Sequence, residues 1–335
     1  MESREWPGRC SGFSSASEVG LASIADAHCD TLMLLTGEHP VASSLTENLP
    51  GHLDLPRMLG AGVGLQFFAL FTEPSHGPGL NLRRILEMIA AFHRSAAMSE
   101  GRLRPVLTAR DVAPQEGSVA GLLAVEGLSS IAGSVEVLES LHMLGVRSAM
   151  LTWNERNDLA DGALDQGSGG GLSVAGKAIV RAMQRLHMLL DVSHLGEKGF
   201  WDLLDASEGP FIASHSNARS LCEHPRNLRD EQLKALASRG GVAGMNFYSG
   251  FIVAEGPAKM DAVMRHIRHI ADLVGPQHIG LGSDFDGIDA WPEGLGGVQD
   301  YPNLRQALAQ AGFSDVESEG ILGGNLRRVL AEVLA

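Results

Sequence analysis

Two histidines, His194 in LLDVSHLG and His215 in PFIASHSN, each stand where a short apolar run gives way to polar residues. His28 and Asp30 in IADAHCD have the same setting, and the run LLAVEGL ends on a carboxylate, Glu126. Imidazoles and carboxylates without a thiolate suit zinc best, and manganese, cobalt or iron by the same geometry. Five such residues predict two Zn²⁺ per chain that share Glu126, and two ions about 3.5–4 Å apart can hold a hydroxide that attacks a carbonyl.

Each predicted ligand also has a structural interpretation. His28 and Asp30 could be a core histidine beside a helix-capping carboxylate, and His52 and Asp54 repeat their spacing. That second pair precedes the helix-like DLPRMLGAG, so we predict that Asp54 is a cap. Glu126 could pair with an arginine at a rim, and the two later histidines could bond to backbone. The setting common to all five favours the metal centre.

Two further residues could act on a substrate. Asp284, in IGLGSDFDG, ends another apolar run and could be a sixth ligand or a general base that passes a proton to a leaving amine. Arg226, in HPRNLRD, could bind both oxygens of a carboxylate with its guanidinium fork, although a loop arginine is more often solvated. Asp286 fits a loop or capping role. His266 and His269, spaced i, i+3, indicate the solvated face of a helix.

The elements that must position these residues alternate along the chain. Eight apolar runs are predicted strands, at 22–28, 63–71, 120–126, 146–152, 188–194, 210–215, 241–247 and 278–284. Predicted amphipathic helices are at 82–99, 133–144, 174–187, 197–206, 230–239, 258–273 and 314–334. This order predicts the α/β class and a (β/α)8 TIM barrel, whose strands carry functional residues at their carboxyl ends.

Composition sets the limits of the fold and of its partners. The 335 residues, 44% hydrophobic, are within the range of one domain, which we place at 21–335 after a loose segment at 1–20. A formal charge of −14 disfavours nucleic acid and anionic membranes, so we expect a small polar substrate. Three cysteines without a CxxC spacing, and no signal peptide or membrane span, predict a cytoplasmic protein. A homodimer is among the states that the sequence allows.

Nine short blocks, in order and spacing, resemble a known family. They are AHCD, DLPRM, QFFALF, AVEG, LTWN, DVSHLG, SHSNAR with HPRN, GSDFDG and GGNLRRVL, between about residues 24 and 330. The chain resembles the membrane dipeptidase (renal dipeptidase) family of zinc metallopeptidases, whose fold is an amidohydrolase-like barrel.

The resemblance implies a role for each residue. His28 and Asp30 would bind one zinc, His194 and His215 the other, and Glu126 would bridge them. Asp284 would be the catalytic acid/base, and Arg226 would hold the terminal carboxylate of the substrate.

One position departs from the family pattern. Where the renal enzyme has a histidine in an LTH block, thought to steady the tetrahedral intermediate, this chain has Trp153 followed by Asn154. Loss of one such donor can cost about 10²–10³ in rate. Asn154 could replace the donor, or the preferred substrate could differ, so both residues are candidate substrate contacts.

We therefore expect a zinc-dependent dipeptidase in which a metal-bridging hydroxide cleaves the peptide bond of a dipeptide, with a D-residue allowed at the C-terminal position. A two-metal hydrolase of another bond, in an N-acyl amino acid or a lactone, is the alternative on the same barrel. A catalytically silent metal-binding barrel is the alternative from another class.

Overall fold

The computed structural model describes residues 24–165 and 167–335, so the predicted segment 1–20 lies outside the described residues, and the boundary at residue 21 stays a prediction. Parallel strands form one closed sheet, because β2 pairs with both β1 and β4. The ring contains β1 (Ile24–Asp26), β2 (Val63–Phe71), β4 (Val119–Glu126), β5 (Val146–Met150), β6 (Leu189–Asp191), β7 (Ile212–Ala213), β8 (Val242–Met245) and β9 (Ile279–Leu281). Short β3 (Leu103–Pro105) pairs with the first residues of β4.

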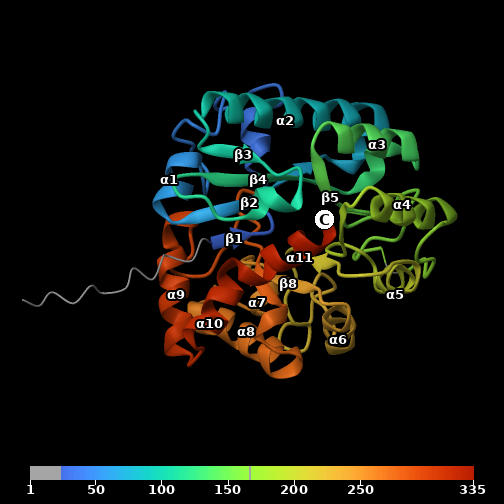
Figure 1. The fold of residues 1–335 in the computed structure, drawn as a ribbon. Helices are drawn as coiled ribbons and strands as arrows, with labels where there is room; N and C mark the ends of the chain where they lie inside the picture. Colours follow the sequence, from blue (N-terminus) through green and yellow to red (C-terminus); the bar gives the residue numbers. More distant parts are fainter. Residues whose placement is uncertain (1–23, 166) are drawn as a thin grey trace, which may run out of the picture.

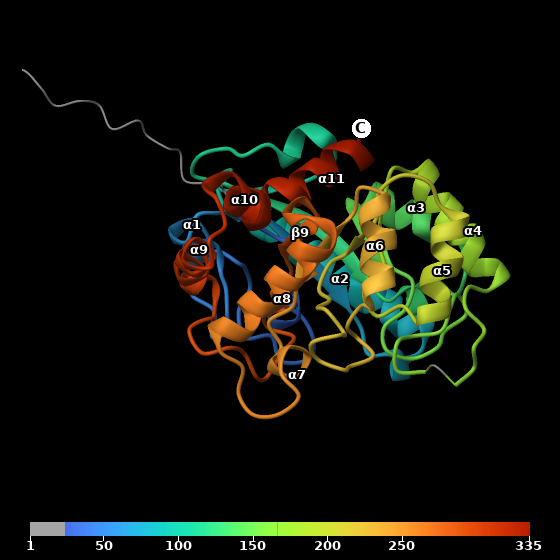
Figure 2. The ribbon, with the colours of Figure 1, turned by 90° about the horizontal axis from the view of Figure 1, so that it is seen from below.

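Helices cover the outside of this ring and one of its ends (Figures 1 and 2). They are α1 (Leu55–Gly60), α2 (Pro78–Met98), α3 (Val135–Met143), α4 (Val174–Arg185), α5 (Glu197–Ala206), α6 (Asp230–Ser238), α7 (Ser249–Ile252), α8 (Met260–Val274), α9 (Tyr301–Gln310), α10 (Asp315–Glu319) and α11 (Asn325–Val333). The predicted (β/α)8 barrel is confirmed, because all eight predicted strands are present and each forms part of the ring.

Two apolar layers hold the barrel together. The larger lies between strands and helices, and the smaller fills the barrel interior with residues such as Ala25, Leu65 and Ile212. Leu326 and Leu330 of α11 pack against the interior layer and close one end of the barrel, where Figure 1 shows α11 crossing the strands. The carboxyl ends of the strands are therefore left to form the site at the opposite end.

Several local features differ from the prediction or refine it. Asp54 caps α1 as expected, with its carboxylate accepting from the backbone N–H of Arg57 at 2.8 Å. The short elements β3 and α7 and the helix α9 were not predicted. His266 was predicted on a solvated face and is 1% exposed instead, because Nε2 bonds to the carbonyl of Ile252 and Nδ1 accepts from the backbone of Ala218.

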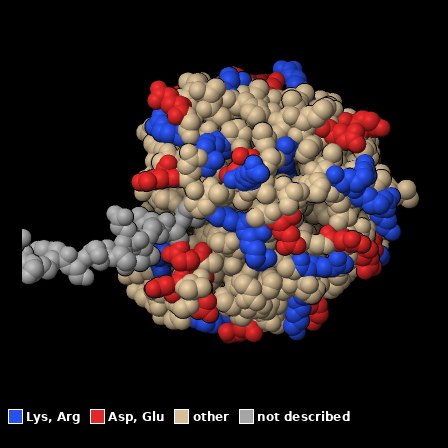
Figure 3. All heavy atoms as spheres, in the orientation of Figure 1, with Lys and Arg blue, Asp and Glu red and all other residues tan. Residues whose placement is uncertain are grey.

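The surface shows no preference for one kind of charge on the face drawn in Figure 3, where acidic and basic side chains alternate. Among the residues that the structure describes, no helix combines the length and the apolar character needed to cross a bilayer.

Candidate metal centre

The predicted ligands meet at the carboxyl ends of four strands. His28 and Asp30 follow β1, Glu126 is the last residue of β4, and His194 and His215 follow β6 and β7. All five are at most 6% exposed. Residues from positions as far apart as 28 and 215 come together because parallel strands in a closed barrel point their carboxyl ends to one rim.

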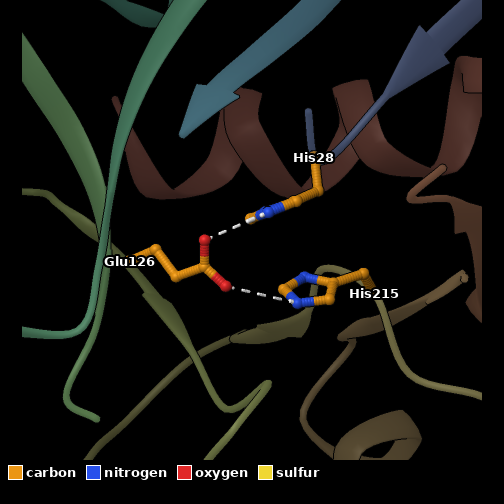
Figure 4. A group of neighbouring side chains, drawn as sticks. All are labelled: His28, Glu126 and His215. Carbon is orange, nitrogen blue, oxygen red and sulfur yellow. Dashed lines mark ion pairs between the residues drawn. The ribbon is translucent and has the colours of Figure 1, made fainter. Parts of the chain in front are cut away.

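The Glu126 carboxylate lies between two groups of these side chains. Its Oε2 is 3.4 Å from Nε2 of His28, and its Oε1 is 2.8 Å from Nε2 of His194 and 3.8 Å from Nε2 of His215. Figure 4 shows one oxygen directed to His28 and the other to His215. The Oδ2 of Asp30 is 3.4 Å from His28 Nε2, on the first side. One carboxylate thus faces two clusters with one oxygen each.

The buried polar atoms of this cluster are arranged to bind a cation and are not arranged as a network of hydrogen bonds. Both ring nitrogens of His28 and the Oδ1 of Asp30 are buried and make no hydrogen bond. Burial lowers the pKa of His28, but Glu126 and Asp30 raise it well above its usual value. Burial and the charge of Glu126 raise the pKa of Asp30 to about 7. A divalent cation would neutralise these groups and use their free lone pairs, so the donor set fits such a metal.

The second histidine pair is oriented by neighbours. Nδ1 of His194 lies 2.8 Å from Oδ1 of Asn154, an acceptor, so this ring nitrogen carries the proton. Burial and the nearby Arg226 lower the pKa of His194 to about 3, so its ring is neutral and Nε2, next to Glu126, keeps a lone pair that a cation could use. The Oγ of Ser214 contacts Nδ1 of His215 at 2.8 Å. Nδ1 contacts of this kind orient a histidine for binding metal through Nε2.

Arg226 lines the cavity over this centre with a buried guanidinium, 3% exposed. Its nitrogens make two long hydrogen bonds, 3.4 Å to Oγ of Ser216 and 3.3 Å to the carbonyl of His215, and Nε has no partner. Within residues 24–165 and 167–335, no carboxylate lies at ion-pair distance from it. Burial lowers the pKa of Arg226 to about 10, which still leaves it charged at neutral pH. A buried cation without a counterion is suited to an anionic ligand.

Asp284 faces the first cluster from the rim of β9. Its Oδ1 is 3.7 Å from His28 Nε2, and its Oδ2 accepts a 2.8 Å hydrogen bond from the side-chain amide of Asn246. Burial raises its pKa above the usual value. The backbone is left-handed at both Asp284 (φ 64°) and His194 (φ 67°), and each lies three positions after the last residue of its strand.

Asp286 has a larger structural role than the predicted capping role. It accepts hydrogen bonds from the hydroxyl of Thr31 and from the backbone N–H of His52, at 2.5 Å and 2.6 Å, and it contacts the ring of His52 at 2.9 Å. These contacts join the Asp284 loop to two segments more than 200 positions away. Sequence spacing gave no sign of this pairing.

Two buried carboxylates under the metal centre were also missed. Asp26 accepts from the hydroxyls of Ser283 and Tyr301, at 2.6 Å and 2.7 Å. Asp191 accepts from the backbone N–H groups of Ser193 and Ser214, both at 3.0 Å. Each therefore connects the start of one rim loop to its neighbour. The signal was present, since both are charged residues inside apolar runs, IADAH and LLDVSH.

Trp153 and Asn154 lie at the same rim, after β5. Trp153 stands beside two rings, with centroid distances of 5.1 Å to Phe71 and 6.0 Å to His194. Both residues line the cavity of about 530 Å³ that also contains Asp30, Glu126 and Arg226. The oxygen of Asn154 is used by His194, so the side-chain NH2 group is the part of Asn154 that could donate to a substrate.

Comparison with known proteins gives one consistent family. The model of the membrane dipeptidase family (peptidase family M19) matches residues 19–335. Dipeptidase aclJ of Aspergillus oryzae is 35% identical over 300 residues, covering 86% of this chain and 71% of its own. The uncharacterized dipeptidase C965.12 of Schizosaccharomyces pombe is 37% identical over 331 residues, covering 92% of this chain and 80% of its own.

Solved structures agree with this result. The metallopeptidase described as dipeptidase AC superposes with a TM-score of 0.87 at 29% identity, over 93% of this chain and 98% of its own. A metallopeptidase from Rhodobacter sphaeroides, liganded with a phosphinate mimic of the dipeptide L-Ala-D-Ala, superposes with a TM-score of 0.86 at 29% identity. The match covers 93% of this chain and 99% of the other. The fold, the rim and the match over nearly the whole chain show that this protein belongs to the membrane dipeptidase family, peptidase family M19.

Proposed function

We propose that this chain is a zinc-dependent dipeptidase that binds two zinc ions. His28 and Asp30 would hold one ion, His194 and His215 the other, and Glu126 both. The support is the position of the Glu126 carboxylate between the two clusters and the unpaired lone pairs around it. When bound, such ions polarise a substrate carbonyl and activate water at neutral pH.

The observation that carries the dipeptide assignment is the unpaired, buried guanidinium of Arg226 at the cavity. A free C-terminal carboxylate would supply the missing counterion, and the fork of Arg226 would bind both of its oxygens. Because this clamp is fixed in the barrel, the distance from it to the Glu126 centre limits how much substrate follows the scissile bond. Such a limit suits the removal of a single C-terminal residue.

Asp284 would handle the proton. It would accept a proton from the attacking water and deliver it to the leaving amine, as a general base and then a general acid. Its raised pKa and its hydrogen bond from Asn246 support this role, because burial makes the carboxylate more basic and the amide holds one of its oxygens in place. Asn154 would act through His194, by fixing its proton on Nδ1, and Trp153 would contact the substrate.

The substrate class that we propose includes dipeptides with a D-residue at the C-terminal position. The support comes from a relative: the ligand of the Rhodobacter sphaeroides metallopeptidase mimics L-Ala-D-Ala. Arg226 would fix the carboxylate of either enantiomer, since it binds a group common to both.

A metal assay combined with matched substrates tests the proposal. We expect about two zinc ions per chain, hydrolysis of L,L- or L,D-dipeptides, and a loss on the order of 100-fold in kcat/KM when the C-terminal carboxylate is amidated, because Arg226 then has no anion to bind. Equal rates with the amide and the acid would remove the clamp role from Arg226, and two bound ions without turnover of either substrate would point to a hydrolase of another bond.

Two controls separate the remaining outcomes. The Arg226→Lys variant keeps the charge but loses the fork, so it should discriminate less between acid and amide than the wild type does. Fewer than one divalent ion per chain, with no turnover of any dipeptide, would favour a catalytically silent barrel.

A further inference from the structure

Three large apolar side chains form one side of the cavity above the metal centre. Met33, Phe71 and Trp153, which we call the apolar wall, all line this cavity. The rings of Phe71 and Trp153 are 5.1 Å apart between centroids, and Met33 is 37% exposed. Apolar surface left open to water in a cavity gains free energy when a ligand covers it, and aromatic rings add a specific contact.

The strand order places Phe71, the centre of this wall, across the barrel mouth from Arg226, with Met33 and Trp153 after β1 and β5 on either side of it. Phe71 ends β2, and Arg226 follows β7, which is four strands away in either direction around the ring of eight. Phe251, on α7 after β8, lies beside Arg226, with the guanidinium 5.6 Å from the centre of its ring. Glu126, the last residue of β4, lies between the two sides. A molecule held by Arg226 and reacting at the centre therefore extends toward the apolar wall.

We infer that the apolar wall binds the side chain of the substrate's N-terminal residue, and that the enzyme prefers dipeptides in which this residue is large and apolar or aromatic. The inference rests on the proposed function, because Arg226 must hold the C-terminal carboxylate for the N-terminal residue to reach the wall. A side chain with a flexible thioether, Met33, can adapt to occupants of different shape.

Space continues beyond the wall. A neighbouring cavity of about 250 Å³ shares Met33 and Phe71 with the first and extends past Thr72 and Met88. A long or aromatic side chain that lies against Phe71 and Met33 therefore has room to continue outward. The side of the cavity near Arg226 differs, since its aromatic residue Phe251 lies beside a charged guanidinium.

A purely structural role for Trp153 has a different consequence. Trp153 stands beside His194, so its loss could disturb metal binding and lower activity on every substrate equally. A role in substrate selection changes the ratio between substrates. The ratio of kcat/KM for two dipeptides that differ only in the N-terminal side chain cancels any loss of metal, so it separates the two roles.

The experiment compares Phe-X with Gly-X, with the same C-terminal residue X, on the zinc-loaded wild type and on Trp153→Ala. We expect the wild type to prefer Phe-X by about 10-fold or more, and the variant to lose most of that preference. The matched control is Phe251→Ala, an aromatic truncation on the Arg226 side, which should keep the Phe-X to Gly-X ratio. Equal rates of the wild type on both dipeptides, or a ratio unchanged in Trp153→Ala, would overturn the inference.

Binding provides a second readout that does not need turnover. Phosphinate mimics of Phe-X and Gly-X, titrated by calorimetry, should show the same preference and the same loss in Trp153→Ala. If the wild type hydrolyses no dipeptide, the proposed function fails, and the two dissociation constants still decide whether the wall binds the N-terminal side chain. Equal constants for the two mimics in the wild type would reject that role.

Discussion

The substitution Gly287→Ala tests how closely the rim is built around the metal centre. A Cβ at this position would lie 2.2 Å from Oδ2 of Asp30 and 2.9 Å from Oδ1 of Asp284. An ordinary contact needs about 3.5 Å, so the Asp30 carboxylate would have to move by roughly 1 Å. That oxygen is now 3.4 Å from Nε2 of His28, and the movement would separate a predicted ligand pair.

We expect the variant to fold but to lose function. Overpacking of this kind costs about 1–3 kcal/mol of stability, which leaves a barrel of this size folded, whereas a misplacement of about 1 Å at a reacting centre can cost about 100-fold in rate. The assays are metal content by emission spectroscopy, the melting temperature with and without zinc, and kcat/KM on a dipeptide. We expect weaker zinc retention and a smaller zinc-dependent rise in melting temperature than in the wild type.

The matched control is Gly79→Ala, on the first turn of α2, where an added Cβ meets no atom within 4 Å. This change should leave metal content and activity as in the wild type and stabilise the fold by at most about 1 kcal/mol. The reasoning is refuted if Gly287→Ala keeps its zinc and works within about 3-fold of the wild type, because the rim would then absorb a methyl group at no functional cost.

Three further predictions concern protons and metal. Asp284→Asn should keep its zinc and lose about 10²–10⁴ in kcat, and retained activity would remove the proton role from Asp284. Burial lowers the pKa of His266 to about 4, so the folded state holds this ring neutral and stability is lost as the pH falls from about 6.5 to about 4, by on the order of 3 kcal/mol. Urea unfolding at pH 5 and pH 7.5 should therefore show a smaller pH dependence for His266→Gln, and an equal dependence would contradict the assignment. Chelation should abolish hydrolysis and lower the melting temperature, and zinc should restore both; unchanged melting would argue against a metal that binds the folded state.

Much of the fold could be predicted from the sequence because its signals are local. Buried parallel strands give apolar runs, and β2, with eight of its nine residues fully buried, coincides with the predicted run 63–71. The same reasoning predicted the functional residues at the strand ends, since a buried charged residue at the end of such a run, such as Glu126, must have a partner. Helices with one apolar face, such as α5, were found at their full length for the same reason.

The parts that could not be predicted depend on partners distant in the chain. His52 and Asp286 are 234 positions apart, and each alone has the sequence environment of an ordinary loop residue. His266 is on a helix with Arg265 and Arg268, which suggested solvent, but its side chain meets backbone groups of two other segments. Local spacing gives the side of a helix and cannot tell which loop will cover it. Only the closed barrel brings these segments together.

The left-handed backbone at His194 and Asp284 has a consequence for engineering. Residues with a Cβ have a conformational cost at φ near 65°, and glycine has almost none. A screen that selects only for heat resistance would therefore favour glycine at both positions, and each substitution would remove a group proposed for metal binding or proton transfer. At these two positions a substitution that raises thermal stability would lower activity, so selection for stability must be paired with an activity screen.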